Sequence, residues 1–226
     1  MLVAAGIGGL AIAVATCIMV FLFRASRGQA IPVAIGIVVV MAVQFALASA
    51  GVLAEWDRRP APIIVVLGLS VMLTVALALS PIGRRLAEGL PLAALIGFQA
   101  FRFPLELVLH RAAATGLMPV QMSFNGDNFD ILTGVLAIPV AWLAWKNRAP
   151  RALVVGWNLL GSTLLLVIVA IAMASTPVVA AFGPDRLNTF IADAPYVWLP
   201  GVLVPSALLG HLLLWRKTAR QARFPC

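Results

Sequence analysis

The stretch LPLAALIGFQAFRFPLELVLH, residues 90–110, decides how many times this chain crosses a membrane. Its length suits a transmembrane helix, which needs roughly 20 mainly apolar residues. It also carries Arg102, Glu106 and His110, and ionisable side chains are rare inside a bilayer. The number of crossings therefore depends on whether this segment spans.

The composition of the whole chain identifies its class. Of its 226 residues, 62% are hydrophobic and only 11% are charged, whereas an ordinary soluble domain has about 25% charged residues. So few polar side chains cannot cover a water-facing surface, and a disordered chain would need even more of them. The sequence therefore predicts an all-α polytopic membrane protein, a helical bundle.

The intervals without charge supply the remaining spans. Each of these intervals is bounded by a single charged residue or by a short cluster of charged residues. A further span at about 128–145 is short, but it runs into Trp142, Trp145 and Lys146, the aromatic and basic residues typical of a membrane interface. Residues 1–226 are expected to form a single seven-span domain, with spans at about 2–23, 31–54, 61–80, 90–110, 128–145, 152–174 and 195–215.

The distribution of Lys and Arg shows that residues 90–110 cross. With seven transmembrane helices and the N-terminus outside, 11 basic residues lie inside and 4 lie outside, with Arg102 in the membrane. Without this crossing the counts become 7 inside and 9 outside. Basic residues collect on the cytoplasmic side of membrane proteins. The C-terminus is therefore expected to be cytoplasmic, and this bias explains the net charge of +8 without a nucleic-acid partner.

One face of the fourth span is polar. Gln99, Arg102, Glu106 and His110 are spaced three and four residues apart, which places them on the same side of a helix. We expect an Arg102–Glu106 ion pair facing the bundle, because an unpaired charge at bilayer depth is costly. Such a pair either fixes the packing of the helix or belongs to a functional site. Pro104 lies between the two charges and predicts a kink.

The segment that follows is also polar. Asn125, Asp127, Asn128 and Asp130 surround a glycine turn, and Asn128 or Asp130 could cap the next helix. Alternatively these residues bring oxygen and amide groups to the outer membrane face near His110. No metal site is predicted, and the sequence indicates no cofactor. Asn158 and His211 lie in later spans, where hydrogen bonds between helices explain such residues.

Three runs resemble a family of bacterial multi-pass inner-membrane proteins. They are FQAFRFPLELVLH at 98–110, MSFNGDNFDILTG at 122–134 and PYVWLPGVLVPSALLGHLLLWR at 195–216. The resemblance covers roughly residues 90–216. It implies a bacterial inner (plasma) membrane location but no activity. The residues that it marks for testing are Arg102, Glu106, His110, Asn128 and Asp130.

Three functions remain open on these grounds. The first is binding or translocation of a small solute or ion through a polar, outward-facing pocket on the fourth span. The second is a membrane enzyme that uses Glu106, His110 and Asp130 as acid/base groups or metal ligands. The third is a non-catalytic subunit that docks a membrane protein partner. All three place the chain in contact with the lipid bilayer.

Overall fold

The computed structural model describes residues 1–223, and these form helices and turns without any strand. Six helical segments in this range are long and apolar enough to cross a membrane. They are α1 (Leu2–Ala25), α2 (Arg27–Ser49), α3 (Pro62–Leu79), Leu92–Ala114, α8 (Arg151–Ala174) and Leu199–Arg220. The all-α fold and six of the predicted spans are therefore confirmed.

The predicted fifth span differs from the others. It contains α7 (Ile131–Trp145), which is apolar but only 15 residues long. The second span also lies earlier than expected, because α2 ends at Ser49 and the chain turns at Gly51, whose φ is +74°. Glycine tolerates this left-handed conformation at no steric cost. Residues 50–54 therefore belong to a turn and a short 3₁₀ helix, η1 (Val52–Ala54).

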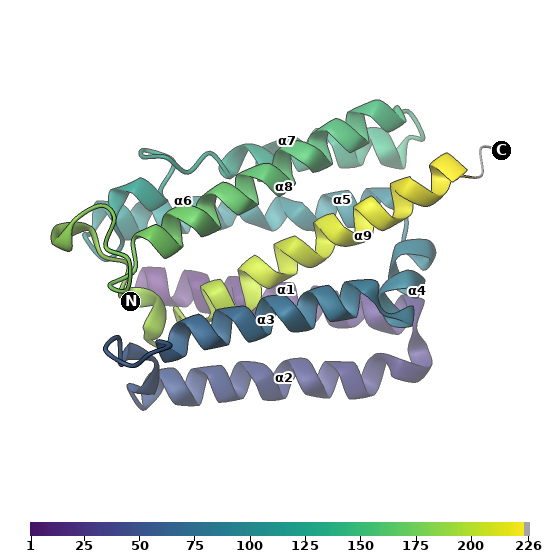
Figure 1. Ribbon diagram of the computed structural model, residues 1–226. Coiled ribbons are helices and arrows are strands. Elements are labelled where there is room, and N and C mark those ends of the chain that lie inside the picture. Colours follow the sequence, from purple (N-terminus) through teal and green to yellow (C-terminus); the bar gives the residue numbers. More distant parts are fainter. Residues whose placement is uncertain (224–226) are drawn as a thin grey trace.

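The connecting segments gather at two ends of the bundle (Figure 1). The N-terminus lies at one end with residues 50–61, 115–130 and 175–198, and we call this the loop end. The other end holds the α1–α2 turn, α4 (Pro81–Gly89), the turn at 146–150 and the last turns of α9 (Val204–Arg223). We call it the basic end, because most of the Lys and Arg residues lie there.

Helix α4 was not predicted, and its start is encoded locally. Pro81 cannot continue α3, because it lacks a backbone N–H. Ser80 ends α3, and its Oγ accepts hydrogen bonds from the backbone N–H groups of Ile82 and Gly83 at 3.1 and 3.2 Å. A serine in this position caps the first turn of a helix. The chain thus turns sharply at the basic end before it enters the next span.

The next span consists of helical pieces. It comprises α5 (Leu92–Phe98), the 3₁₀ turn η2 (Gln99–Phe101) and α6 (Arg102–Ala114). Pro104 lies in the first turn of α6, and a proline leaves the carbonyl four residues earlier, here that of Ala100 in the 3₁₀ turn, without its helical partner. The expected irregularity is therefore present, and it lies just before Arg102.

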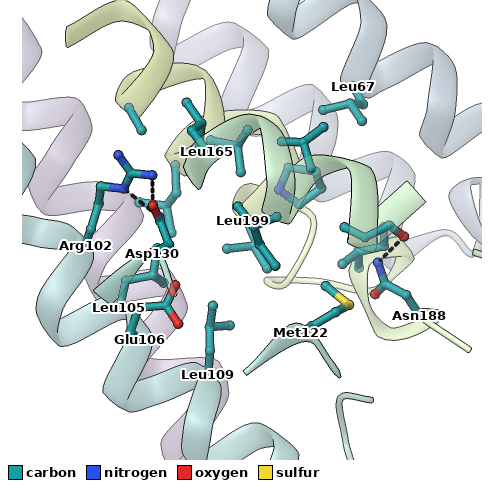
Figure 2. A pocket seen from close by; sticks show the side chains of 18 of the residues that line it. Leu67, Arg102, Leu105, Glu106, Leu109, Met122, Asp130, Leu165, Asn188 and Leu199 are labelled. Atoms are coloured by element: carbon teal, nitrogen blue, oxygen red, sulfur yellow. Dashed lines mark hydrogen bonds and ion pairs between the residues drawn. The ribbon is translucent and has the colours of Figure 1, made fainter. Parts of the chain in front are cut away.

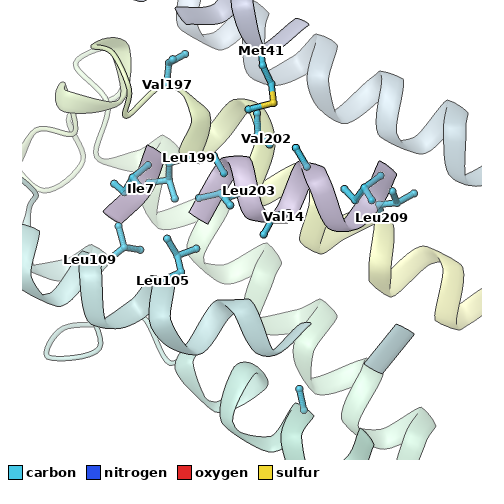
Figure 3. Close-up of a cluster of buried hydrophobic side chains, with 14 of the residues drawn as sticks. Ile7, Val14, Met41, Leu105, Leu109, Val197, Leu199, Val202, Leu203 and Leu209 are labelled. Atoms are coloured by element: carbon cyan, nitrogen blue, oxygen red, sulfur yellow. The ribbon is translucent and has the colours of Figure 1, made fainter. Parts of the chain in front are cut away.

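The core is centred on α1 and on the segment that leads into α9. Ile7 and Val14 of α1 face Leu105 and Leu109 of α6 and Leu203 before α9 (Figure 3). The segment that leads into α9 contains a π-helical turn, η6 (Leu199–Leu203), whose residues are all buried. By contrast, α2 and α3 leave many large apolar side chains exposed. In a membrane these side chains face lipid tails, so the bundle is held together by close packing and polar contacts.

Candidate functional site

A buried ion pair joins α6 to the start of α7. The guanidinium of Arg102 donates from Nε to Oδ2 of Asp130 at 2.6 Å, and its Nη2 pairs with Oδ1 (Figure 2). Both residues are almost completely buried. This two-pronged arrangement uses the fixed fork of arginine and holds the two helices in one orientation.

The partner of Arg102 is therefore not the expected one. We predicted an Arg102–Glu106 pair within one helix, and that prediction is wrong, because Asp130 of α7 takes the guanidinium. Glu106 instead accepts hydrogen bonds from Nδ2 of Asn128 at 3.0 and 2.9 Å, one to each carboxylate oxygen. Helical spacing correctly placed Arg102 and Glu106 on one face, but it could not show which helix packs against that face.

His211 and Asn158 extend the network to α9 and α8. Nη1 of Arg102 lies 2.8 Å from Nε2 of His211, and Nδ1 of His211 lies 2.7 Å from Oδ1 of Asn158. A guanidinium can only donate, so Nε2 is the acceptor and Nδ1 carries the hydrogen. This is the neutral form of the imidazole. The expectation of hydrogen bonding between helices is confirmed for both residues, but their link to Arg102 was missed.

Asn128 connects the carboxylate of Glu106 to the backbone of Asp130. Besides holding Glu106, its Oδ1 accepts from the backbone N–H of Asp130 at 3.0 Å, and its Nδ2 donates to the carbonyl of Met122 at 3.0 Å. The loop end and the ion pair are therefore parts of one hydrogen-bonded unit. The predicted side-chain cap is not present, because Asp130 is the N-cap residue of α7 and neither its side chain nor that of Asn128 accepts from an N–H group of the first helical turn.

The ion pair lies at mid-depth in the bundle. Arg102 is near the middle of the Leu92–Ala114 segment, and a Cβ at Gly134 would lie 3.1 Å from the Cα of Phe103. α7 therefore starts well inside the bundle, and only a glycine allows this close approach. Its 15 residues, about 22 Å of helix, reach from there to the basic end.

Irregular backbone fills the bundle between the start of α7 and the loop end. Gln121 donates from Nε2 to Oγ of Ser175 and to the carbonyl of Arg186, both at 3.0 Å. These bonds tie segment 115–130 to segment 175–198. Non-helical backbone at membrane depth is tolerated only where it is buried in protein or lines a cavity. Both conditions are met here, because Gln121 is buried and Met122 lines the cavity described next.

A cavity of about 70 Å³ lies beside the network. Arg102, Glu106 and Asp130 lie along one side of it, and Met122 and Asn188 lie across from them (Figure 2). The rest of the lining is almost entirely apolar and comes from α3, α6, α8, η6 and α9. A cavity of this size can hold several water molecules or one small ion with part of its hydration shell.

The other predicted site residues lie elsewhere. Gln99 is buried and donates from Nε2 to the carbonyl of Ala207 at 2.9 Å. His110 stacks on Phe124 with ring centroids 4.4 Å apart, and its buried Nδ1 has no hydrogen-bond partner among the described residues. Asn125 and Asp127 are exposed at the loop end. Among the described residues, no three His, Cys, Asp or Glu side chains are placed to share a metal ion.

Double-mutant cycles test which carboxylate is coupled to Arg102. Because removing one member of a buried ion pair strands the other, Asp130→Asn should lower the free energy of unfolding by about 3–5 kcal/mol. Arg102→Met should then cost much less in the Asp130→Asn background than in wild type. The matched cycle of Arg102→Met with Glu106→Gln should show a clearly smaller coupling energy, because these two side chains share the network without pairing directly. Denaturant unfolding in detergent measures both cycles, and additivity of Arg102 with Asp130 would contradict the pairing.

Comparison with known proteins gives one family match, and it includes this site. The model of a family described as a domain of unknown function (DUF8737) matches residues 60–217. This range includes Arg102, Glu106, Asp130, Asn158 and His211, and it covers more than half of the chain. No curated protein and no solved structure matches the chain. The chain is a multi-pass membrane protein that belongs to the DUF8737 family.

Proposed function

We propose that this protein binds a proton or a small monovalent cation at Glu106 and passes it through the cavity beside the Arg102–Asp130 pair. The observation that carries the proposal is a charge imbalance. Two buried carboxylates, Glu106 and Asp130, line the cavity, but only one buried guanidinium, that of Arg102, lines it with them. The guanidinium of Arg102 forms its ion pair with Asp130, whereas Glu106 accepts hydrogen bonds only from the side-chain amide of Asn128.

The neighbouring groups cannot supply the missing positive charge. Hydrogen bonds with Arg102 and Asn158 hold His211 in its neutral form, and the amide side chain of Asn128 is uncharged. With both carboxylates ionised, the network would carry a net charge of −1 at mid-depth. Such an uncompensated charge is expensive in a membrane. A proton or a cation at Glu106 removes it, so this carboxylate is the group best placed to bind either one.

The architecture around Glu106 supports an ion site. α7 begins inside the bundle, and the helix that carries Glu106 is interrupted just before Arg102. Interrupted helices at mid-depth are typical of the substrate and ion sites of membrane transporters. The cavity also extends toward the loop end, where Thr176, Asn188 and Ile191 line it. We therefore infer that the ion reaches Glu106 from the loop end.

The same proposal includes the topology. We infer seven crossings in a single domain, with α7 as the short fifth span, completed at the loop end by residues 115–130. The helices then alternate between the two ends in Figure 1. The basic end holds 11 of the 16 Lys and Arg residues, so the positive-inside rule puts the basic end in the cytoplasm and the N-terminus outside. The sequence resemblance favours a bacterial inner membrane.

Ion flux tests the role of Glu106. Proteoliposomes are loaded with a pH-sensitive dye for proton flux, and radioactive Na⁺ and K⁺ uptake is measured in parallel. We expect one of these fluxes in wild type and its loss, to the level of protein-free liposomes, in Glu106→Gln. Glutamine keeps the size and the contact with Asn128 but cannot ionise. The control is Asp127→Asn, which changes an exposed carboxylate in segment 115–130 and should leave the flux unchanged.

Either of two results would refute this proposal. A Glu106→Gln protein that folds and keeps the wild-type flux shows that this carboxylate is not needed. The absence of all three fluxes in wild type shows that the protein does not translocate these ions. The three separate readouts also distinguish a proton from an alkali cation as the species carried.

Cysteine labelling tests the seven-crossing topology. In a Cys17→Ala, Cys226→Ala background, Asp57→Cys and Asn147→Cys place single thiols on exposed positions at the two ends. A membrane-impermeant maleimide should label Asp57→Cys in intact spheroplasts and Asn147→Cys only after permeabilisation. Labelling of Asn147→Cys in intact spheroplasts would show that α7 does not cross. Cys226 itself lies outside the described residues.

A further inference from the structure

A second cavity opens between α2 and α3, away from the polar network. This space of about 370 Å³ is apolar apart from Ser70, Thr74 and Ser206. α2 packs mainly on α1, and α3 packs mainly on α9, so the two helices leave room between them. We call this space the α2–α3 groove, and its walls include Val33, Gly36, Ile37, Leu73, Thr74 and Leu77.

The groove runs along the bundle axis. On α2 its lining extends from Val33 to Met41, a distance of about 12 Å at 1.5 Å per residue. Gly36 contributes no side chain, and a Cβ built there would meet nothing within 4 Å. The groove is thus a long, narrow, apolar channel beside the lipid, with the shape and chemistry of a site for one hydrocarbon chain.

One end of this groove lies next to a cationic group. Gln29 is one helical turn from Val33 on α2, toward the basic end, and its Oε1 accepts a hydrogen bond from Nη1 of Arg85 at 3.0 Å. The same Nη1 lies 3.4 Å from Oγ of Ser26. Because both contacts use Nη1, the Nε–H and Nη2 groups of this exposed arginine have no hydrogen-bond partner among the described residues and are available to an anion.

The charges around Arg85 favour an anionic partner. Among the described residues of the basic end, Glu88 is the one acidic side chain, and Arg220 pairs with it. Arg216 and Lys217 donate to backbone carbonyls at the ends of α3 and α4, at Ala78 and Ala87 among others. No neighbouring carboxylate therefore competes for Arg85.

We propose that the α2–α3 groove and Arg85 together bind one anionic phospholipid from the leaflet at the basic end. One acyl chain lies in the groove, and the phosphate accepts hydrogen bonds from the Nε–H and Nη2 groups of Arg85. A guanidinium binds phosphate through two parallel hydrogen bonds, which suits this geometry. This site is independent of Glu106, so it stands whether or not the chain moves an ion.

Native mass spectrometry with defined lipids tests the site. Detergent-purified protein is mixed with equal amounts of dioleoyl phosphatidylglycerol and dioleoyl phosphatidylcholine, which share acyl chains and differ in net charge. We expect one retained phosphatidylglycerol and little phosphatidylcholine. Arg85→Gln should reduce the bound phosphatidylglycerol by about fivefold, since one basic residue contributes about 1 kcal/mol toward an anionic lipid. Gly36→Leu should reduce it similarly by filling the groove.

Two matched controls separate this site from general attraction. Arg148→Gln removes an exposed charge from another turn at the basic end, and Gly68→Leu adds the same side chain to an open position on α3 outside the groove. Both should bind like wild type. Equal retention of the two lipids would overturn the proposal. So would a loss in Arg148→Gln as large as in Arg85→Gln, or unchanged binding in Gly36→Leu.

Discussion

A guanidinium at mid-depth in a membrane bundle needs a carboxylate, and Arg102 of α6 obtains it from Asp130 at the start of α7. This requirement shapes much of the surrounding structure. Asp130 must lie deep inside, so α7 starts there and residues 115–130 turn back into the bundle. Gly134 allows α7 to approach the backbone of α6 closely enough for the pair to form. His211 and Asn158 then bring α9 and α8 to the same point.

The pair leaves Glu106 as the one carboxylate of the network without a positive partner. Asn128 holds that carboxylate in place and also fixes the start of α7. Glu106 therefore lies in a defined position beside a cavity, and its charge remains to be balanced. Rigid placement together with an uncompensated charge is what a site for a proton or a small cation requires.

Hydrophobic length and charge position were sufficient to predict most of the spans, because both are properties of single segments. They also identified Arg102, Glu106, Asn128 and Asp130, since polar residues at membrane depth stand out in so apolar a chain. Pairing was not predictable in the same way. Arg102 and Asp130 are 28 residues apart, and His211 is 109 residues from Arg102. Only the packing of four helices brings them together, and periodicity within one helix favoured the wrong partner.

If Glu106 has no resident counter-ion, its carboxyl group should hold a proton when no alkali cation is present, and infrared spectroscopy of the protein in lipid films tests this directly. The spectra are recorded at neutral pH in choline chloride, where no small alkali cation is present. Subtracting the Glu106→Gln spectrum from the wild-type spectrum should show the C=O stretch of a protonated carboxyl group. Addition of Na⁺ or K⁺ should weaken that band if the cation replaces the proton. A wild-type protein with an ionised Glu106 in choline chloride, and hence no such band, would contradict the account.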